Sequence, residues 1–245
     1  QANDMPAVAI TDHGVMYGVG EFLAYAKKIQ TPVKPIVGCE FYITDDRFKR
    51  EGKMGDSNHL ILLAKDLKGY KNLVKLDTFA FTEGFYYKPR IDFDLLKQYR
   101  EGLVCLSACL AGEVPRFLLA GNYAGARECA KRYKELFGED YYIEIQDHNL
   151  REEKAILPSL IKLASELSIE LVATNDVHYI KKEDSEMQRV LNCVSTAKKI
   201  DEPNEMQLET DEFYLKNYDE MDMLFPTLTR ALENTLVIAN KCNLV

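Results

Sequence analysis

Hydrophobic positions along the chain follow two patterns, short apolar runs and longer stretches with helical periodicity. The short runs are rich in Val, Ile and Leu and cover residues 7–10, 33–37, 60–63, 103–106, 141–145 and 171–173. Between several of them, apolar residues recur with helical spacing over residues 18–29, 70–81, 123–137 and 153–167. A repeated order of strand and then helix is typical of βαβ units around a mainly parallel sheet. We therefore predict an α/β fold with a barrel-like shape.

Residues from 181 onward follow a different pattern. Helical signals appear over 185–194 and 228–241, on either side of an irregular acidic stretch, IDEPNEMQLETDEF, and no run there has the pattern of a strand. The chain contains no internal repeat, low-complexity segment or Gly/Ser linker. We therefore predict one domain over residues 1–245, with a barrel over about 1–180 and a helical tail over about 181–245.

Composition and charge exclude several classes of protein. Hydrophobic residues make up 47% of the chain and charged residues 29%, which is the profile of a folded globule. The net charge of −8 repels phosphate backbones, so any contact with DNA is expected to be local. The six cysteines form no C-x-x-C pair, which argues against a zinc ribbon or a dithiol redox motif. With no long apolar run and no signal-peptide pattern, we expect a cytoplasmic protein without a membrane partner.

Three of the four histidines lie at ends of predicted strands, in the segments TDHG, SNHL and NDVH. They are His13, His59 and His178, and strand ends that open onto loops are where α/β folds build their sites. Asp176 and His178 are two positions apart, so on an extended chain both side chains point to one side and can reach one metal ion. This spacing predicts a metal site.

Two further acidic residues fit the same interpretation. Asp12 and His13 are adjacent and point opposite ways, so we expect His13 to bind metal and Asp12 to orient it or a neighbour. Glu40 ends the run PIVGCE, where a carboxylate on an otherwise buried strand needs a charged partner. A metal ion would be such a partner.

Each of these residues also has an ordinary structural explanation. A single histidine is more often a surface or core residue than a ligand. Asp12 could cap a turn, Asp176 could begin one, and Glu40 could pair with a lysine. His148, in QDHNL, fits the pattern less well, and we expect it either behind the ligands or exposed to solvent. From the residues alone, both interpretations stay open.

Five segments in order carry a resemblance to a known family: AVAITDHGVMYG, KPIVGCEFYI, SNHLILLAKDLKGYKNL, EGLVCLSACLAGEVPR and LVATNDVHY. They resemble the PHP (polymerase and histidinol phosphatase) domain of bacterial DNA polymerase III alpha subunits. The segments EGFYYKPRID and ETDEFYLK resemble that polymerase branch rather than the free-standing PHP phosphatases. The resemblance implies a distorted (β/α)7 barrel with a cluster of up to three metal ions at the strand ends.

The resemblance also implies a set of metal ligands. Carried over position by position, they are His13, Glu40, His59, Cys109, Asp176 and His178. Cys109 would stand where many PHP phosphatases have a histidine, and a thiolate suits zinc, so zinc is the expected metal, with manganese or magnesium as alternatives. Without the resemblance, Cys109 would be taken as a small buried core residue.

One part of the family pattern has no counterpart. The family's opening H-x-H motif lies on a first strand, whereas this sequence starts at Gln1, with QANDMP reading as the end of a helix and its turn into a strand. We therefore expect the chain to begin inside the domain and to lack the first strand and several ligands. A complete trinuclear site is not expected from this chain alone.

The resemblance implies metal-dependent phosphoester hydrolysis within a parent DNA-directed DNA polymerase. In this family the activity is usually described as 3′-5′ exonuclease activity, or proposed as pyrophosphate removal. Lys88 and Arg90 in YYKPR are candidates to hold substrate phosphates, or else solvated loop cations. Implied partners are DNA, through the parent polymerase, and other replicase subunits such as a proofreading exonuclease. A scaffold that docks this exonuclease and a free-standing PHP phosphatase are the alternative functions.

Overall fold

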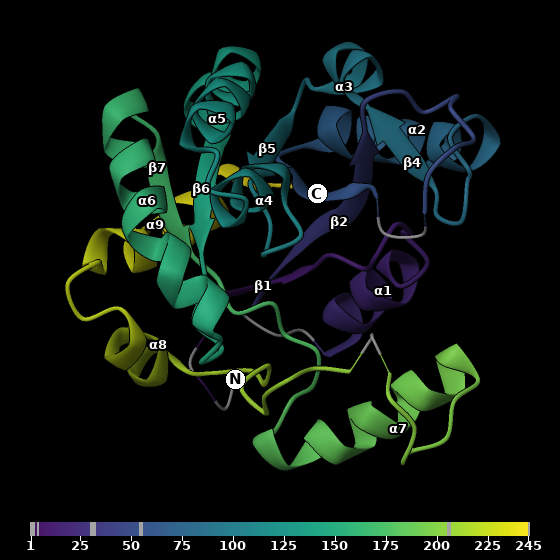
Figure 1. Ribbon diagram of the computed structural model, residues 1–245, viewed down its shortest axis with the longest axis vertical. Helices are drawn as coiled ribbons and strands as arrows, with labels where there is room; N and C mark the ends of the chain where they lie inside the picture. The colour runs from purple at the N-terminus through teal and green to yellow at the C-terminus, as the bar shows by residue number, and fades with distance from the viewer. Residues whose placement is uncertain (1–2, 4, 30–32, 54–55, 205–206, 245) are drawn as a thin grey trace.

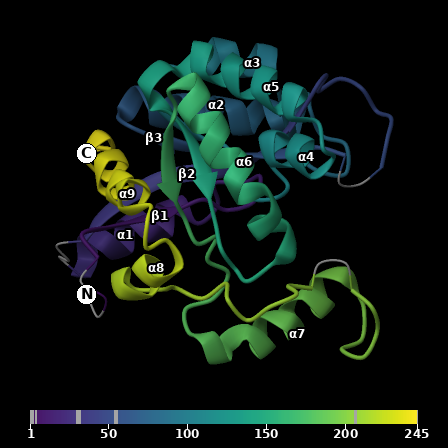
Figure 2. The ribbon, with the colours of Figure 1, turned by 60° about the vertical axis from the view of Figure 1, so that its left-hand side comes forward.

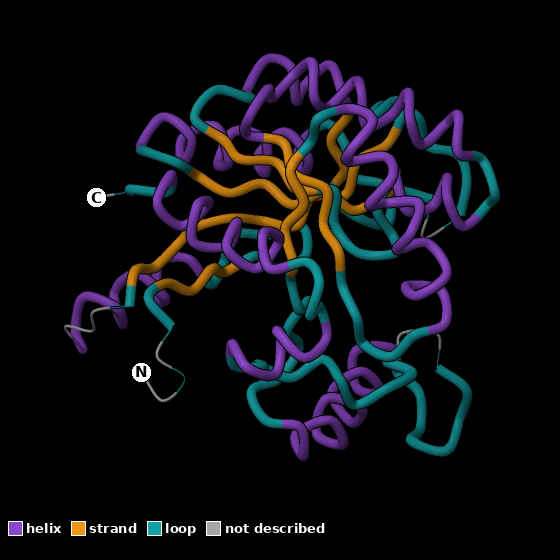
Figure 3. The backbone as a smooth tube through the Cα atoms, turned by 90° about the vertical axis from the view of Figure 1, so that its left-hand side faces the viewer, coloured by secondary structure: helices purple, strands orange, loops and turns teal. Residues whose placement is uncertain are grey.

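The computed structural model describes residues 3, 5–29, 33–53, 56–204 and 207–244. In that part of the chain the strands form one curled sheet, which lies at the centre of the molecule (Figure 3). The strands are β1 (Ala7–Ile10), β2 (Lys34–Thr44), β3 (Asn58–Ala64), β4 (Arg90–Asp92), β5 (Leu103–Leu106), β6 (Tyr141–Ile145) and β7 (Glu170–Ala173). Their order across the sheet is β1-β2-β3-β5-β6-β7, and β4 pairs with β2.

Most neighbouring strands run parallel, and β3 is the exception. It follows β2 in the sequence and runs antiparallel to both β2 and β5, whereas β1-β2, β5-β6 and β6-β7 are parallel pairs. The C-terminal ends of the parallel strands therefore share one rim of the sheet with the N-terminal end of β3. Within the described residues no pairing joins β7 to β1, so the sheet is open on that side.

Helices cover the outer face of the sheet (Figure 1). Those that follow the strands are α1 (Val19–Ile29), α2 (Leu67–Thr82), α3 (Phe93–Tyr99), α4 (Glu113–Leu119), α5 (Tyr123–Phe137) and α6 (Arg151–Leu167). Strand side chains point alternately to the two faces of a sheet, and on β2 the alternate residues Val37, Cys39 and Phe41 pack in one core with buried residues of these helices. Burial of these apolar surfaces is the main force that holds the helices on the sheet.

The inner face of the sheet packs against the last helix. Its core combines strand residues with residues of α9 (Thr229–Lys241): Ile36, Ile61, Leu63, Val104, Leu106, Tyr142, Val172, Ile238 and Ala239. Polar contacts fix the same helix, because Lys34 Nζ donates to the carbonyl of Ala239 over 2.9 Å. The backbone N–H of Asn243 also donates to the carbonyl of Lys65 over 2.6 Å. The C-terminal segment thus belongs to the core of the sheet.

The remaining helices are α7 (Ser185–Thr196) and α8 (Tyr218–Leu224). Figures 1 and 2 show α7 standing away from the sheet, on a long connection that returns toward it before α8. Every helix in the described part of the chain is too short or too polar to span a lipid bilayer.

The structure confirms the predicted α/β fold and its curled, barrel-like sheet. Every predicted strand is present, although the second runs on to Thr44. One strand and three α-helices were not predicted: β4, α3, α4 and α8. The boundary near residue 180 and the missing first strand stay predictions.

Candidate metal centre

His13 and Glu40 meet where β1 runs beside β2. The two residues form a bridge of parallel pairing just beyond the end of β1, with the N–H of Gly14 donating to the Glu40 carbonyl over 2.7 Å. The N–H of Glu40 donates in turn to the carbonyl of Asp12 over 3.1 Å. This backbone pairing places His13 Nδ1 2.6 Å from Glu40 Oε1.

His59 reaches the same carboxylate from the opposite side. It lies at the start of β3, and its N–H donates to the carbonyl of Ala111 over 2.9 Å. Its Nδ1 atom is 2.8 Å from Glu40 Oε1, so one buried oxygen accepts from two imidazoles. The side chain of Cys109, in the loop after β5, lies next to them with Sγ 3.6 Å from His59 Nδ1.

Asp176 and His178 approach from the loop after β7. The rings of His178 and His13 have their centroids 5.7 Å apart. Nδ1 of His178 lies 2.7 Å from the backbone carbonyl of Asp176 and donates to it, which leaves Nε2 as the nitrogen that could bind a metal. The structure thus brings all six predicted ligands to one rim, although they span residues 13 to 178.

Glu40 carries a negative charge at the middle of the centre, although its side chain is only 4% exposed. Burial opposes its ionisation, but the hydrogen bonds and charges of His13 and His59 together outweigh burial and lower the pKa of Glu40 to about 2. The bond to Glu40 likewise raises the pKa of His13. The centre therefore holds a carboxylate that stays negative at neutral pH.

Comparison with known proteins agrees with this geometry. The sequence profile of the PHP domain matches residues 1–148, more than half of the chain. The chain belongs to the PHP domain family.

Relatives of this PHP domain are much longer proteins. The chain is 48% identical over 241 residues to the DNA polymerase III subunit alpha of Treponema pallidum (strain Nichols), covering 97% of the chain and 20% of that relative. It is 43% identical over 243 residues to the subunit of the same name from Borreliella burgdorferi, covering 98% of the chain and 21% of the relative. For the DNA polymerase III subunit alpha of Thermus aquaticus the identity is 40% over 245 residues. The chain thus spans about a fifth of the length of these curated relatives.

PHP domains generally bind divalent metals. The donor types at this rim, imidazole, carboxylate and thiol, are those that zinc accepts. In the described ranges, no three such side chains already stand in an arrangement that would hold a metal ion. Glu40 Oε1 lies instead within hydrogen-bond distance of two imidazole nitrogens.

The two phosphate-binding candidates of the PHP domain lie in different surroundings. Lys88 Nζ is 5.4 Å from the ring centroid of Tyr42, and its charge acts against the protonation of His13, so it lies beside the centre. Arg90 is buried, and its guanidinium donates to the carbonyls of Gly84 and Lys49 over 3.0 and 2.7 Å. We therefore keep Lys88 alone as the phosphate-binding candidate.

Asp12 contributes to the centre through its backbone. Its carbonyl accepts from the N–H of Glu40 and from the thiol of Cys39, while its carboxylate lies against Gly18. The role of the Asp12 side chain in orienting His13 stays a prediction.

His148 is buried, with 1% of its surface exposed, so the expectation of solvent exposure is wrong and the position behind the ligands remains. Sequence reasoning also missed Glu144 on β6, where the carboxylate is buried and its Oε1 accepts from Thr174 Oγ1 over 2.8 Å. Glu144 Oε2 has no partner in the described part of the chain, and burial raises the pKa of Glu144 to about 7. The sequence could have pointed to Glu144, because an acidic residue inside the apolar run 141–145 is buried at a cost and needs an explanation.

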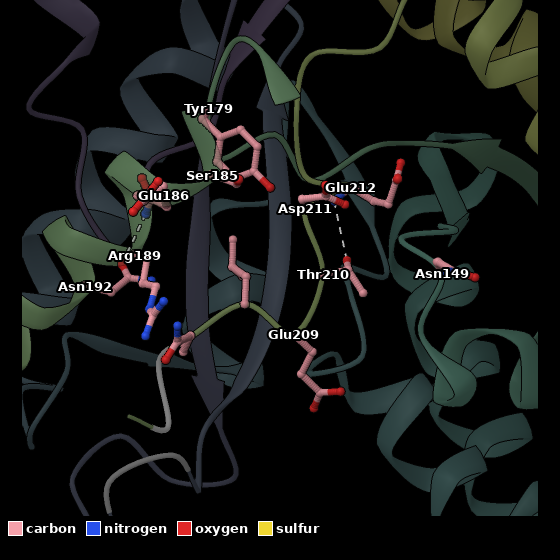
Figure 4. Close-up of a pocket in the computed structure, with 13 residues that line it drawn as sticks. Asn149, Tyr179, Ser185, Glu186, Arg189, Asn192, Glu209, Thr210, Asp211 and Glu212 are labelled. Atoms are coloured by element: carbon pink, nitrogen blue, oxygen red, sulfur yellow. Dashed lines mark hydrogen bonds between the residues drawn. The ribbon is translucent and has the colours of Figure 1, made fainter. Parts of the chain in front are cut away.

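A larger cleft lies away from the six predicted ligands, none of which is among its described lining residues. It measures about 700 Å³ and lies between α7, Asn149, Tyr179 and the segment 207–212. Figure 4 shows Thr210, Asp211 and Glu212 along one wall of this cleft. This cleft is therefore separate from the candidate metal centre.

Proposed function

We propose that this PHP domain belongs to a DNA polymerase III alpha subunit, a DNA-directed DNA polymerase, and that its rim binds divalent metal, zinc above all. The proposal extends to metal-dependent hydrolysis of phosphoesters, with the 3′ end of a DNA strand as the substrate. The parent function is supported by relatives of that name that align over nearly the whole chain.

One observation carries the proposal of a metal site. Glu40 Oε1 lies within 2.8 Å of Nδ1 atoms from both His13 and His59, although the three residues come from separate segments. A buried carboxylate shared by two imidazoles is costly to assemble for stability alone, because it removes a charge from water. Cys109, Asp176 and His178 surround it with further metal-binding groups.

The proposed ligands are His13, Glu40, His59, Cys109, Asp176 and His178. A bound zinc ion would supply a Lewis acid and an acidified water at neutral pH. The protein's own part is to bring these side chains to one rim and to keep Glu40, whose pKa is lowered to about 2, ionised. Lys88 would offset the negative charge of a substrate phosphate beside the centre.

The proposed partners are DNA, through the parent polymerase, and other replicase subunits, among them a proofreading exonuclease. We expect no primer extension by the chain itself, since nucleotidyl transfer needs strand-borne carboxylates that clamp two metals. In its C-terminal part, the described residues from 181 to 244 form helices and irregular segments. The protein is expected to act in the cytoplasm.

The test uses the full-length protein, purified after chelator treatment and reconstituted with zinc, manganese or magnesium. Metal content is measured by mass spectrometry, and removal of nucleotides from a 3′-labelled DNA strand is followed in the same samples. We expect zinc to bind and His59→Ala to lower both zinc content and nucleotide release. The matched control is Asn58→Ala, which changes the neighbouring residue. Full hydrolysis in metal-free His59→Ala protein would contradict the proposal.

A further inference from the structure

The loop that carries Asp176 and His178 is held from behind by His148. Nε2 of this buried histidine lies 2.8 Å from the backbone carbonyl of Asn175, directly before Asp176. On the other side of the ring, Nδ1 lies 2.6 Å from Glu153 Oε1. The His148 backbone N–H also donates to Glu153 Oε2 over 2.6 Å. His148 thus links the start of α6 to the loop after β7.

Both ring nitrogens of His148 face acceptors, a carbonyl oxygen and a carboxylate oxygen. Each contact requires a proton on the nitrogen, so the ring is an imidazolium that donates in both directions. Burial disfavours this charge, but the hydrogen bond to Glu153, the charge of Glu153 and the hydrogen bond to Asn175 act together against burial and the pKa of His148 is raised. Charge-assisted hydrogen bonds are stronger than neutral ones, so the hydrogen bond from His148 to the Asn175 carbonyl is a strong one.

Phe213, in the segment ETDEFYLK, lies between His148 and the proposed ligand His178. Its ring stacks on His148 with centroids 3.9 Å apart and planes 6° from parallel. It also meets the ring of His178 edge to face, with centroids 5.4 Å apart and planes at 86°. The backbone N–H of His178 donates to the Phe213 carbonyl over 2.9 Å. Phe213 therefore contacts His178 both through its ring and through its backbone carbonyl, and these contacts restrict the position and orientation of the His178 ring.

The loop needs such support because its conformation is unfavourable by itself. Asp176 has φ of +40°, a left-handed conformation that is uncommon for residues with a side chain. Its side chain is also only 22% exposed. A strained loop with a partly buried charge keeps its shape only when its surroundings hold it.

We propose that His148 and Phe213 are positioning residues of the metal centre, fixing Asp176 and His178 in the geometry that binds metal. The inference rests on the proposed function and assigns a role to two residues outside the ligand set. It also explains why ETDEFYLK lies beside the PHP centre although it follows residue 148, where the profile match ends. The segment ETDEFYLK packs against the loop that carries Asp176 and His178.

The test measures metal binding in the full-length protein with three variants. His148→Phe keeps a ring for stacking and removes both hydrogen bonds, Phe213→Leu keeps the bonds and removes the ring, and Phe213→Tyr restores a ring of the same size. Phe225→Leu is the matched control, because Phe225 is also buried in the C-terminal segment and belongs to the helix-covered core. Readouts are zinc affinity by chelator competition, the visible absorption spectrum of the cobalt-loaded protein, and the melting temperature.

We expect His148→Phe and Phe213→Leu to weaken zinc binding by roughly 10- to 100-fold, the usual effect of removing a group that orients a ligand. Both should change the cobalt spectrum, and Phe213→Tyr should recover most of the affinity. Phe225→Leu should lower the melting temperature and leave affinity and spectrum unchanged. The inference is overturned if His148→Phe and Phe213→Leu behave like Phe225→Leu. Failure of the wild-type protein to bind zinc or cobalt would overturn the proposed metal site, and this inference with it.

Discussion

His59 and Glu40 lie on paired antiparallel strands but are not opposite one another. Glu40 is paired with Ile61 and His59 with Tyr42, so the contact of 2.8 Å between their side chains runs diagonally across the pair. Diagonal neighbours on one face of a sheet are within reach of long side chains. A shift of the pairing by one residue would turn one partner to the outer face, so the register of β2 and β3 determines whether the centre exists.

Replacing Glu40 tests its place in the centre. In Glu40→Gln the shape is kept and the negative charge between His13 and His59 is lost, so zinc affinity should fall at least about tenfold. Chelator competition measures this affinity. Glu51→Gln is the control, because the Glu51 side chain is 77% exposed and pairs with Lys49. Unchanged zinc affinity in Glu40→Gln would remove Glu40 from the ligand set.

The thiol of Cys109 should decide which metal is preferred. Thiolates favour zinc, and carboxylates and hydroxyls favour manganese or magnesium, so Cys109→Ser should lower the ratio of zinc to manganese affinity. Titration of the metal-free protein with each ion gives this ratio. Cys193→Ser provides a comparison, since Cys193 is buried in α7, away from the proposed ligands. Equal ratios in wild type and Cys109→Ser would show that this thiol does not bind the metal.

Glu144 should make the stability of the metal-free protein depend on pH. Burial raises its pKa from 4.5 to about 7, so the folded state holds the proton more tightly than the unfolded state. This contribution to the free energy of unfolding is fully present below pH 4.5 and is lost as pH rises toward about 7, a loss on the order of 3 kcal/mol. Glu144→Gln should therefore be more stable than wild type at pH 8.

Urea unfolding of both proteins at pH 5 and pH 8 measures the difference. Glu152→Gln, an exposed position at the start of α6, should follow the wild-type pH dependence. A Glu144→Gln protein with the same pH slope as wild type would mean that the pKa of Glu144 is the same in the folded and unfolded states.

Gly69 should tolerate no side chain, because α2 begins against the loop before β5. A Cβ atom at Gly69 would lie 1.9 Å from the backbone oxygen of Gly102. Gly69→Ala is therefore expected to cost about 1–3 kcal/mol of stability, as overpacking usually does. Gly20→Ala in α1 meets no atom within 4 Å and should be neutral or stabilising. Melting temperatures compare them, and equal values for the two variants would contradict this prediction.

The sequence predicted the parts of the fold that have a strong local pattern. β5 and β6 are apolar runs buried on both faces, and α5 and α6 have clear helical periodicity, so each was found from its own residues. β4 has three residues and was missed, because its pairing with β2 is a contact between distant segments.

The candidate site was predictable to a similar degree. His59 and His178 were singled out because they end predicted strands, and Cys109 entered only through the family resemblance. The contacts of His148 were not predictable, since its partners Glu153 and Asn175 are brought together by tertiary packing. The stacking of Phe213 depends on a segment that the irregular pattern of the tail gave no reason to place at the rim.

The long separation between the two sides of the rim has a consequence for how the protein is made. His13 leaves the ribosome long before His178, and the carbonyl of Phe213 that holds His178 follows later still. Domains fold as units while the N-terminal part is synthesised first, so the nascent chain carries His13, Glu40 and His59 without their counterparts until His178 has been made. The proposed metal centre can therefore be complete only after His178 and Phe213 have been synthesised and the two sides of the sheet have come together.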